Sequence, residues 1–306
     1  MSRRLRRLSA VSRDLYRRAR GHAEVREEDR FQPRLRLDAE APELMLSPHW
    51  DDSVLDCWSL LVSERELNVV NVFGGIPQRT DAGPWEAVLG ASDPAERARG
   101  RMAEDTAALA RTGRTPLNLP LLGSGYRHQA PHHVSLDELD RALATEVPSA
   151  SRVYVPAGIG AHRDHRLTRR YGRMLLRYGM PVTLYADLPY CVLHGWPSWV
   201  DGREPAPNRD VDAYWQPFLA GVPELVSLRS AEVERLDERM AKAKCEAIES
   251  YENSLSYGFR RMLADPTLHS FEVRWQLDSP AVHVAQETAR SAVGGRLSEP
   301  SGRPAA

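Results

Sequence analysis

The sequence predicts an α/β fold of three layers, in which helices cover both faces of a mainly parallel, Rossmann-like sheet. Short segments of high β propensity alternate along the chain with segments whose apolar residues recur at helical spacing. With 306 residues, 42% of them apolar, the chain is long enough to bury a substantial core. Its three cysteines are too few and too scattered for a disulfide scaffold.

The predicted strands and helices follow one another from residue 43 to residue 186. A strand is predicted where a short run of apolar or β-branched residues lies between turn residues. A helix is predicted where apolar residues return every three or four positions. The predicted strands are residues 43–47, 67–73, 116–121, 152–157 and 181–186. The predicted helices are residues 53–64, 94–112, 136–146 and 166–178.

The region after the last of these strands is rich in loops and aromatic residues. Residues 189–223 hold Trp196, Trp199 and Trp215 among several prolines. Residues 230–251 then show apolar side chains at helical spacing. This spacing predicts one long amphipathic helix whose apolar stripe packs against the core.

The two ends of the chain differ in composition from the segment between them. Residues 1–36 form an Arg-rich leader whose apolar residues lie at helical spacing. We interpret it as a solvated surface helix, with contact to an anionic membrane surface as the alternative. Residues 281–306 are rich in Ser, Gly, Pro and Arg, which predicts a flexible tail. Residues 37–280 therefore make up the expected folded domain.

The charge balance and the hydropathy exclude several classes of protein. The 41 basic and 42 acidic side chains leave a formal net charge of −1, which argues against a nucleic-acid binder. No apolar stretch approaches the roughly 20 residues of a membrane helix. The start of the chain lacks the apolar run of a secretory signal. Together with the few cysteines, these features predict a cytoplasmic protein.

Chemically active side chains gather where the first predicted strand ends. His49, Asp51 and Asp52 lie at a strand-to-helix turn. The adjacent carboxylates would repel each other if both were buried and ionised, so a positive partner is expected nearby. A divalent metal ion and an arginine are the two candidates. The simpler alternative is an ordinary helix N-terminus, at which Asp and Ser cap free backbone N–H groups.

A second cluster follows the fourth predicted strand. His162, Asp164 and His165 open the next helix after a glycine-containing turn. Because the carboxyl ends of parallel strands meet at one edge of a sheet, the two clusters can converge. Two histidines and one aspartate then offer three nitrogen and oxygen ligands, the number typical of a catalytic zinc site. The expected cofactor is Zn²⁺, with Fe²⁺ or Co²⁺ as alternatives.

These motifs carry a resemblance to a known family. Residues 48–52 (Pro-His-Trp-Asp-Asp) resemble the His-Pro-Asp-Asp motif of the PIG-L/LmbE-like family of zinc-dependent de-N-acetylases. Residues 161–165 (Ala-His-Arg-Asp-His) resemble the second histidine motif of that family. Weaker similarities lie at residues 101–104, 186–190 and 242–251, in the family's order. The resemblance implies that residues 37–280 are a deacetylase-like catalytic domain.

The resemblance also implies which side chains would hold the metal ion and move the proton. His49, Asp52 and His165 match the family's metal ligands, and Asp51 matches its general base. The choice between the two aspartates comes from the family pattern, because the sequence alone does not distinguish them.

Three further residues match positions around the expected reaction centre. His162 would stabilise the oxyanion, preferably as imidazolium. Asp164 would hydrogen-bond to His162 and favour that charged form. Arg101 would bind hydroxyl groups of a sugar, with a plain surface arginine as the alternative.

The chain departs from the family pattern beside the expected metal. Trp50 stands where the family usually has proline, and Ser53 stands where it usually has an acidic residue. We expect Trp50 to reshape the substrate pocket, and His194 is a candidate to reach that pocket. Together with the aromatic region at residues 189–223, these departures suggest a specialised substrate.

The function that the resemblance implies is metal-dependent hydrolysis of an N-acetyl group. The expected partner is a small N-acetylated amino sugar or glycoconjugate. The alternatives are an amidase of the same family that acts on a thiol conjugate or a natural-product amide, and a non-catalytic carbohydrate-binding protein. Nucleotide binding is disfavoured because no Gly-x-Gly-x-x-Gly turn follows the first predicted strand. The sequence gives no signal for an oligomeric state.

Overall fold

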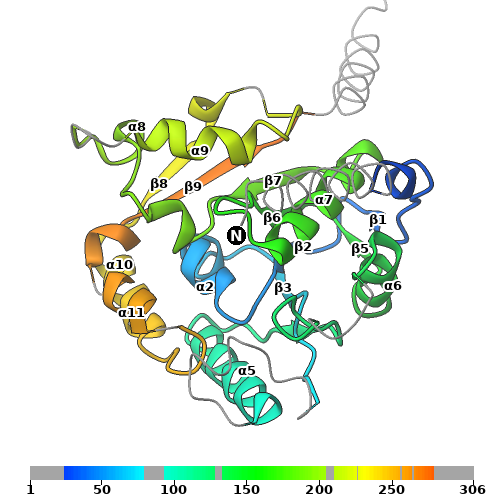
Figure 1. The fold of residues 1–306 in the computed structure, drawn as a ribbon, viewed down its shortest axis with the longest axis horizontal. Helices are drawn as coiled ribbons and strands as arrows, with labels where there is room; N and C mark the ends of the chain where they lie inside the picture. Colours follow the sequence, from blue (N-terminus) through cyan, green and yellow to red (C-terminus); the bar gives the residue numbers. More distant parts are fainter. Residues whose placement is uncertain are drawn as a thin grey trace, which may run out of the picture.

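A seven-stranded sheet with helices on both sides forms the centre of the computed structural model (Figure 1). The structure describes residues 24–78, 93–127, 133–204, 210–225, 227–255, 257–263 and 265–278. The first part of the predicted leader, residues 1–23, and the predicted tail lie outside these described residues.

The strands and helices agree closely with the sequence pattern in the first part of the chain. The strands are β1 (Arg36–Leu37), β2 (Glu43–Ser47), β3 (Leu67–Asn71), β4 (Leu117–Asn118), β5 (Ser149–Ala150), β6 (Val153–Pro156), β7 (Val182–Tyr185), β8 (Glu232–Arg235) and β9 (Phe271–Gln276). The helices are α2 (Asp52–Asp56), α3 (Trp58–Leu61), α5 (Pro94–Ala110), α6 (Leu136–Glu146), α7 (Arg163–Arg177), α8 (Ser198–Asp201), α9 (Val211–Leu219), α10 (Glu238–Ile248) and α11 (Tyr257–Leu263).

The order of the strands determines where a ligand can bind. The large sheet runs β4-β3-β2-β6-β7-β9-β8, and its first five strands are parallel. From β2 the chain moves outward to β3, whereas from β6 it moves outward in the opposite direction to β7. Right-handed crossovers then place the following helices on opposite faces of the sheet. The predicted three-layer, mainly parallel fold is thereby confirmed, and β2 and β6 form its switch point.

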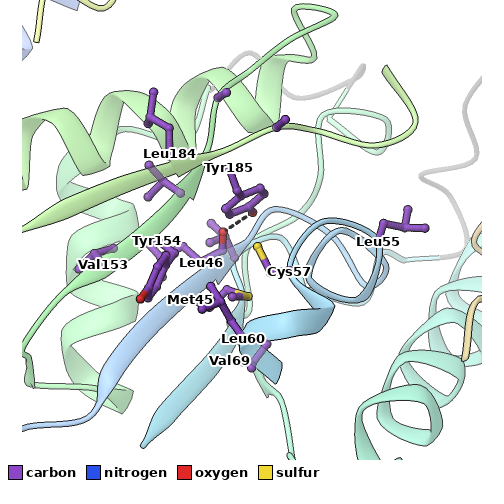
Figure 2. Packing of buried hydrophobic residues seen from close by; sticks show 14 of the residues in the cluster. Met45, Leu46, Leu55, Cys57, Leu60, Val69, Val153, Tyr154, Leu184 and Tyr185 are labelled. Carbon is purple, nitrogen blue, oxygen red and sulfur yellow. Dashed lines mark hydrogen bonds between the residues drawn. The ribbon is translucent and has the colours of Figure 1, made fainter. Parts of the chain in front are cut away.

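The core lies between the central strands and the short helices that follow β2. Met45 and Leu46 on β2 and Val153 on β6 are fully buried. Figure 2 shows these side chains packed beside Cys57, with the Tyr185 hydroxyl donating a hydrogen bond of 2.8 Å to the carbonyl oxygen of Leu46. This bond ties β7 to β2 across β6, so the strand ends that carry the two motifs are held in a fixed relation.

The predicted helix over residues 53–64 is divided at Cys57 into α2 and α3. The backbone N–H groups of Trp58 and Ser59 donate to the carboxylate of Glu272 at 2.6 and 3.1 Å. Glu272 comes from β9, far along the chain, and provides the N-terminal cap that α3 lacks locally. The buried ammonium group of Lys244 on α10 donates to the same carboxylate at 3.0 Å.

The single long helix predicted over residues 230–251 is wrong in its first part. Residues Glu232–Arg235 form β8, which pairs antiparallel with β9, and α10 begins only after Asp237. The Asp237 side chain caps α10 by accepting the N–H of Met240 at 2.7 Å. The apolar positions of residues 232–235 are compatible with the period of a helix and with the alternation of a strand. The pairing of this segment with β9 therefore determines that it forms a strand.

The aromatic region after β7 is more ordered than its composition predicts. Over the residues described there, α8 and α9 contribute Trp199 and Trp215, and Trp215 packs edge-on against Trp275 of β9 at 5.8 Å between ring centres. Its indole N–H donates to the carbonyl oxygen of Cys191 at 2.9 Å. The region therefore covers the antiparallel end of the sheet (Figure 1).

We expect substitution of Lys244 by methionine to destabilise the fold strongly. The change leaves the Glu272 carboxylate buried without its ammonium partner, which costs about 3 to 5 kcal/mol in comparable pairs. Urea unfolding measures the loss. Lys242→Met, at an exposed position of the same helix, is the matched control and should shift stability by less than about 0.5 kcal/mol. Equal stability of the two variants would contradict the role given to the Lys244–Glu272 pair.

Candidate functional site

The two motifs meet because β2 and β6 are neighbours in the sheet. Leu44 pairs with Val153 and Met45 with Tyr154 in parallel register, so both strands end at the same edge. The segment after β2 carries His49, and the segment after β6 carries the second cluster. This edge is the switch point of the sheet, where open α/β folds bind their ligands.

The turn before α7 requires an unusual backbone. Gly160 has φ = 84°, and a Cβ atom at this position would lie 2.7 Å from the Cβ atom of Tyr190. Ala161 adopts φ = 62°, a left-handed conformation that is costly for a residue with a side chain. Glycine is therefore required at position 160, and the turn brings Tyr190 against the second cluster.

Two of the predicted ligands, His49 and His165, lie on either side of one carboxylate oxygen of the third, Asp52. Asp52 Oδ2 lies 3.2 Å from Nδ1 of His49 and 3.4 Å from Nε2 of His165. The same oxygen accepts the backbone N–H of His49 at 2.8 Å. One ligand atom from each of His49, His162 and His165 lies within 4.8 Å of the other two, and the same holds for His49, Asp51 and Asp52.

The second nitrogen of each imidazole is held by another carboxylate. Nδ1 of His165 lies 2.7 Å from Oδ1 of Asp187, which also accepts the N–H of Gly158. Nε2 of His49 lies 3.1 Å from Oδ2 of Asp164. Carboxylates in this position orient histidines that bind a metal ion and increase their basicity.

The residues present fit a divalent metal ion. Ligand atoms around tetrahedral zinc, at bonds of about 2.0–2.1 Å, lie roughly 3.3 Å apart, close to the two spacings around Asp52. Nε2 of His165 is buried and makes no hydrogen bond among the described residues, although Asp52 Oδ2 lies 3.4 Å from it, so the nitrogen is available to a metal ion. The alternating array of three carboxylates and two imidazoles also carries more negative than positive charge, which favours a cation.

Asp164 does not make the contact that the sequence predicted. Instead of His162, its carboxylate contacts His49, the backbone N–H of Ser124 at 2.7 Å, and the guanidinium of Arg127. The predicted Asp164–His162 bond is therefore wrong. Burial would raise the pKa of Asp164, but these donors outweigh it and hold the pKa below its ordinary value, so the side chain is a carboxylate.

The electrostatics separate the two adjacent aspartates. Burial would raise the pKa of Asp52, but the attraction of His165 and His49 lowers it well below its ordinary value. Burial and the neighbouring Asp52 charge raise the pKa of Asp51. Desolvation opposes the charge on His165, but Asp52 and Asp187 outweigh it and raise the pKa of His165. Asp51 is thus the more basic of the two carboxylates.

His162 lies over the cluster in the wall of the cavity. Its ring centre is 4.8 Å from that of His49 and 5.0 Å from that of His165, and it stacks on Tyr190 at 6.0 Å. Burial and the neighbouring His49 and His165 lower the pKa of His162 to about 3. The ring is therefore neutral at pH 7 in this structure, in contrast to the imidazolium expected from the sequence.

Arg101 contacts Asp51 in the site, whereas Trp50 is buried and contacts Arg101. A terminal nitrogen of Arg101 lies 3.8 Å from Oδ1 of Asp51, and the guanidinium stacks 5.1 Å from the Trp50 ring centre. Trp50 is 1% exposed, and its indole N–H donates to Asn118 at 2.8 Å. Trp50 is absent from the described residues that line the cavity. It would therefore affect a ligand only by positioning Arg101.

A cavity of about 610 Å³ opens beside the cluster. It contains His49, Asp51, Asp52, Arg101, His162 and Asp164 in its wall, together with the apolar side chains of Leu55, Tyr190, Leu255 and Phe259. His194 is exposed and packs edge-on against Tyr214 at 4.7 Å, outside the described wall of this cavity. The structure thus brings together all the predicted residues except Trp50 and His194.

The site also contains side chains that the sequence reasoning did not assign to it. Asp187 holds His165, Arg127 holds Asp164, and Tyr190 stacks on His162. Asp187 and Tyr190 follow β7 directly, so their place after a third strand of the same sheet is a signal that could have identified them. Arg127 carries no comparable signal, because it lies in a loop.

Comparison with known proteins gives matches among solved structures. Neither the protein-family models nor the curated proteins match the chain. A triple mutant of Orf2, a deacetylase of the teicoplanin biosynthetic pathway, aligns with a TM-score of 0.55 and 24% identity, over 78% of this chain and 98% of that chain. The A40926 pseudoaglycone deacetylase Dbv21 aligns with a TM-score of 0.54 and 24% identity, over 79% and 98%.

A zinc-inhibited form of teicoplanin deacetylase Orf2 aligns with a TM-score of 0.54 and 23% identity, over 77% of this chain and 97% of that chain. These three solved structures are deacetylases, the activity that the motif resemblance implies. At this identity the likeness establishes the fold. Within the described residues, no helix is both long enough and apolar enough to cross a membrane.

We expect substitution of Asp187 by asparagine to weaken metal binding without unfolding the protein. An amide replaces one of two oxygens that accept from His165, Gly158 and Ile159, so at least one donor faces an NH₂ group. Loss of such an orienting carboxylate typically lowers metal affinity about 10- to 100-fold. Competition with a chromogenic chelator for Zn²⁺ measures the change. The exposed Asp278→Asn variant should bind like the wild type, and equal affinity in both variants would contradict the role of Asp187.

The buried carboxyl group of Asp105 should make the stability of the protein depend on pH. It accepts from Asn71 at 2.7 Å and Tyr251 at 2.8 Å, and burial raises its pKa to about 8. Because the unfolded chain releases this proton near pH 4, Asp105 lowers stability progressively as the pH rises from about 4 to about 8.

Asp105→Asn should remove this slope. The stability difference between the variant and the wild type should rise in favour of the variant by about 2–3 kcal/mol from about pH 5 to about pH 7. Urea unfolding at the two pH values measures it. A difference that does not change with pH would mean that Asp105 titrates like an exposed aspartate.

Proposed function

We propose that the chain is a divalent-metal-dependent hydrolase that removes the N-acetyl group from an amino sugar carried by a glycoconjugate. The observation that carries the proposal is the alternating array Asp164–His49–Asp52–His165–Asp187, with Asp51 beside it in the wall of a cavity. The array has the composition of a metal site with oriented histidines, and Asp51 has the burial and raised pKa of a base.

His49, Asp52 and His165 would hold the metal ion. When bound, a divalent ion supplies Lewis acidity, which polarises a carbonyl group and makes water more acidic. Asp164 and Asp187 would keep the two imidazoles in the required tautomer and orientation. The candidates are Zn²⁺, Fe²⁺ and Co²⁺. Because one form of the similar Orf2 structure is zinc-inhibited, each ion should be tested separately and at increasing concentration.

Asp51 would act as the general base. It takes the proton of the attacking water as that water adds to the amide carbonyl, and then delivers a proton to the departing amine. Its raised pKa makes it a stronger base than an ordinary aspartate. Arg101, 3.8 Å away, would orient the Asp51 carboxylate and limit this rise in pKa.

His162 and the apolar wall would position the acyl group. The Nδ1 atom of His162 is buried and has no hydrogen-bond partner among the described residues, and the ring lies in the wall of the cavity. A neutral imidazole with its N–H directed into the cavity would donate to the developing oxyanion. Tyr190, Leu255 and Phe259 form an apolar part of the same wall, suited to the acetyl methyl group.

The structural neighbours and the size of the cavity support a proposal for the substrate class. The structural neighbours include deacetylases that act in glycopeptide biosynthesis, on teicoplanin-pathway and A40926-type molecules. A volume of about 610 Å³ is within the usual range for a small-molecule site and accommodates an amino sugar. We therefore propose an N-acetylated amino sugar attached to a larger group, in a soluble cytoplasmic enzyme.

We expect substitution of Asp51 by asparagine to abolish turnover while metal binding persists. Loss of a general base typically lowers the rate about 10²- to 10⁴-fold. Acetate release from N-acetylglucosamine, its methyl glycoside and a glycoconjugate that carries N-acetylglucosamine measures activity, and elemental analysis measures the metal. His165→Ala should lose the metal and activity together, whereas Asp278→Asn should keep both.

The outcomes separate the alternatives. Metal bound by wild type without acetate release from any of these substrates would favour an amidase with another acyl substrate, for which a thiol conjugate is the next assay. No metal after reconstitution with each ion, together with sugar binding, would favour a non-catalytic carbohydrate-binding protein. Full activity of Asp51→Asn would overturn the role of Asp51.

A further inference from the structure

A second cavity, of about 650 Å³, borders the one that holds the metal-site residues. Ser124 and Arg163 belong to the walls of both cavities, so the two cavities are adjacent at this point. The wall of the second cavity is strongly basic. Its arginines are Arg127, Arg163, Arg166, Arg169, Arg170 and Arg173, most of them on α7.

Half of these arginines already have carboxylate partners. Arg127 pairs with Asp164. Arg170 pairs with Glu27 at 2.8 Å and with Glu28 at 2.7 Å, two of the three glutamates in the wall of this cavity. Arg173 forms two hydrogen bonds, of 2.8 and 2.9 Å, to Glu224. The charges of this group are therefore balanced within the protein.

Arg163, Arg166 and Arg169 are not balanced in this way. Arg163 and Arg166 are exposed, and neither forms an ion pair among the described residues. Arg169 donates to the carbonyl oxygens of Ala157 at 2.6 Å and Phe218 at 2.7 Å, which hold the guanidinium without neutralising it. Three positive charges thus remain on one stripe of α7 at a spacing of three residues.

This arrangement destabilises the isolated helix. Like charges three residues apart repel each other, and cations near a helix N-terminus oppose the helix dipole. Burial lowers the pKa of Arg169 to about 10; attraction by Asp187 opposes this shift, and repulsion by Arg166 and Arg173 adds to it. An anion in the cavity would remove this repulsion, and guanidinium groups bind oxyanions through two parallel hydrogen bonds.

We propose that the second cavity binds an oxyanion group of the substrate, a phosphate or a carboxylate, through Arg163 and Arg166. The amino sugar would lie in the first cavity with its acetyl group at the metal site, and its charged substituent would cross the shared wall at Ser124. The preferred substrates are then anionic conjugates of N-acetylated amino sugars. This inference rests on the proposed function for the place of the sugar.

The test measures binding to the metal-free protein by titration calorimetry, separately from turnover. The ligands are N-acetylglucosamine 1-phosphate, N-acetylmuramic acid as the carboxylate, and methyl N-acetylglucosaminide as the neutral reference. Wild type should bind at least one anionic ligand about tenfold or more tightly than the neutral one. This preference should disappear in Arg163→Gln/Arg166→Gln and decrease in each single variant. The preference should also weaken as salt is raised.

Arg99→Gln is the matched control, because it removes one exposed positive charge from α5, on another side of the molecule from α7 (Figure 1). It should keep the preference for the anion. A preference only for the phosphate, or only for the carboxylate, supports the proposal and identifies the oxyanion. Equal binding of neutral and anionic ligands by wild type, or a preference that survives in the double variant, overturns it.

Turnover separates this inference from the proposed function. Acetate released equally fast from neutral and anionic substrates, with no anion preference in binding, would overturn the oxyanion site and leave the hydrolase intact. An anion preference lost in the double variant, without acetate release from any ligand, would retain the oxyanion site and contradict the proposed deacetylation.

Discussion

A charge inside a protein is stable only when an opposite charge or hydrogen-bond donors lie within reach. Beyond the ends of β2, β6 and β7 the chain buries carboxylates and imidazoles in strict alternation: Asp164, His49, Asp52, His165 and Asp187. Each imidazole lies between two carboxylates, and Asp52 is common to both. Displacing any member leaves a neighbour buried without its partner, so the array requires the strand ends that carry it to remain in register.

The order of the strands in the sheet keeps the strand ends that carry the array next to one another. The array draws on segments after three different strands, and β7 follows β6, which follows β2, in the sheet. The Tyr185 hydroxyl bond to Leu46 links the outer two of these strands across the middle one. The ion pairs of the array and the packing of the core therefore hold the same three strands together. A change that loosened the sheet at this point would also displace Asp51, which lies beside the array.

Local patterns in the sequence were sufficient for the parallel strands and for the residues that converge. β2 and α6 occur where periodicity places them, and His49 and His165 meet because they follow adjacent strands. Long-range contacts were not predictable. The break at Cys57 depends on Glu272, and the partner of Asp164 depends on which of two nearby imidazoles turns toward it. Such choices are made by tertiary geometry, which spacing along the chain does not encode.

The Glu272 carboxylate has a consequence for when the site can form. It caps α3, the second helix after the first histidine motif. Glu272 itself lies on β9, the last strand along the described chain, 214 residues after Trp58. On a ribosome, the helix must remain uncapped until nearly the whole described chain has emerged. The residues of the alternating array all precede Glu272 in the chain, so they are synthesised before it. Assembly of this centre is thus a late event, timed by the arrival of the C-terminal strand and not by the synthesis of its own ligands.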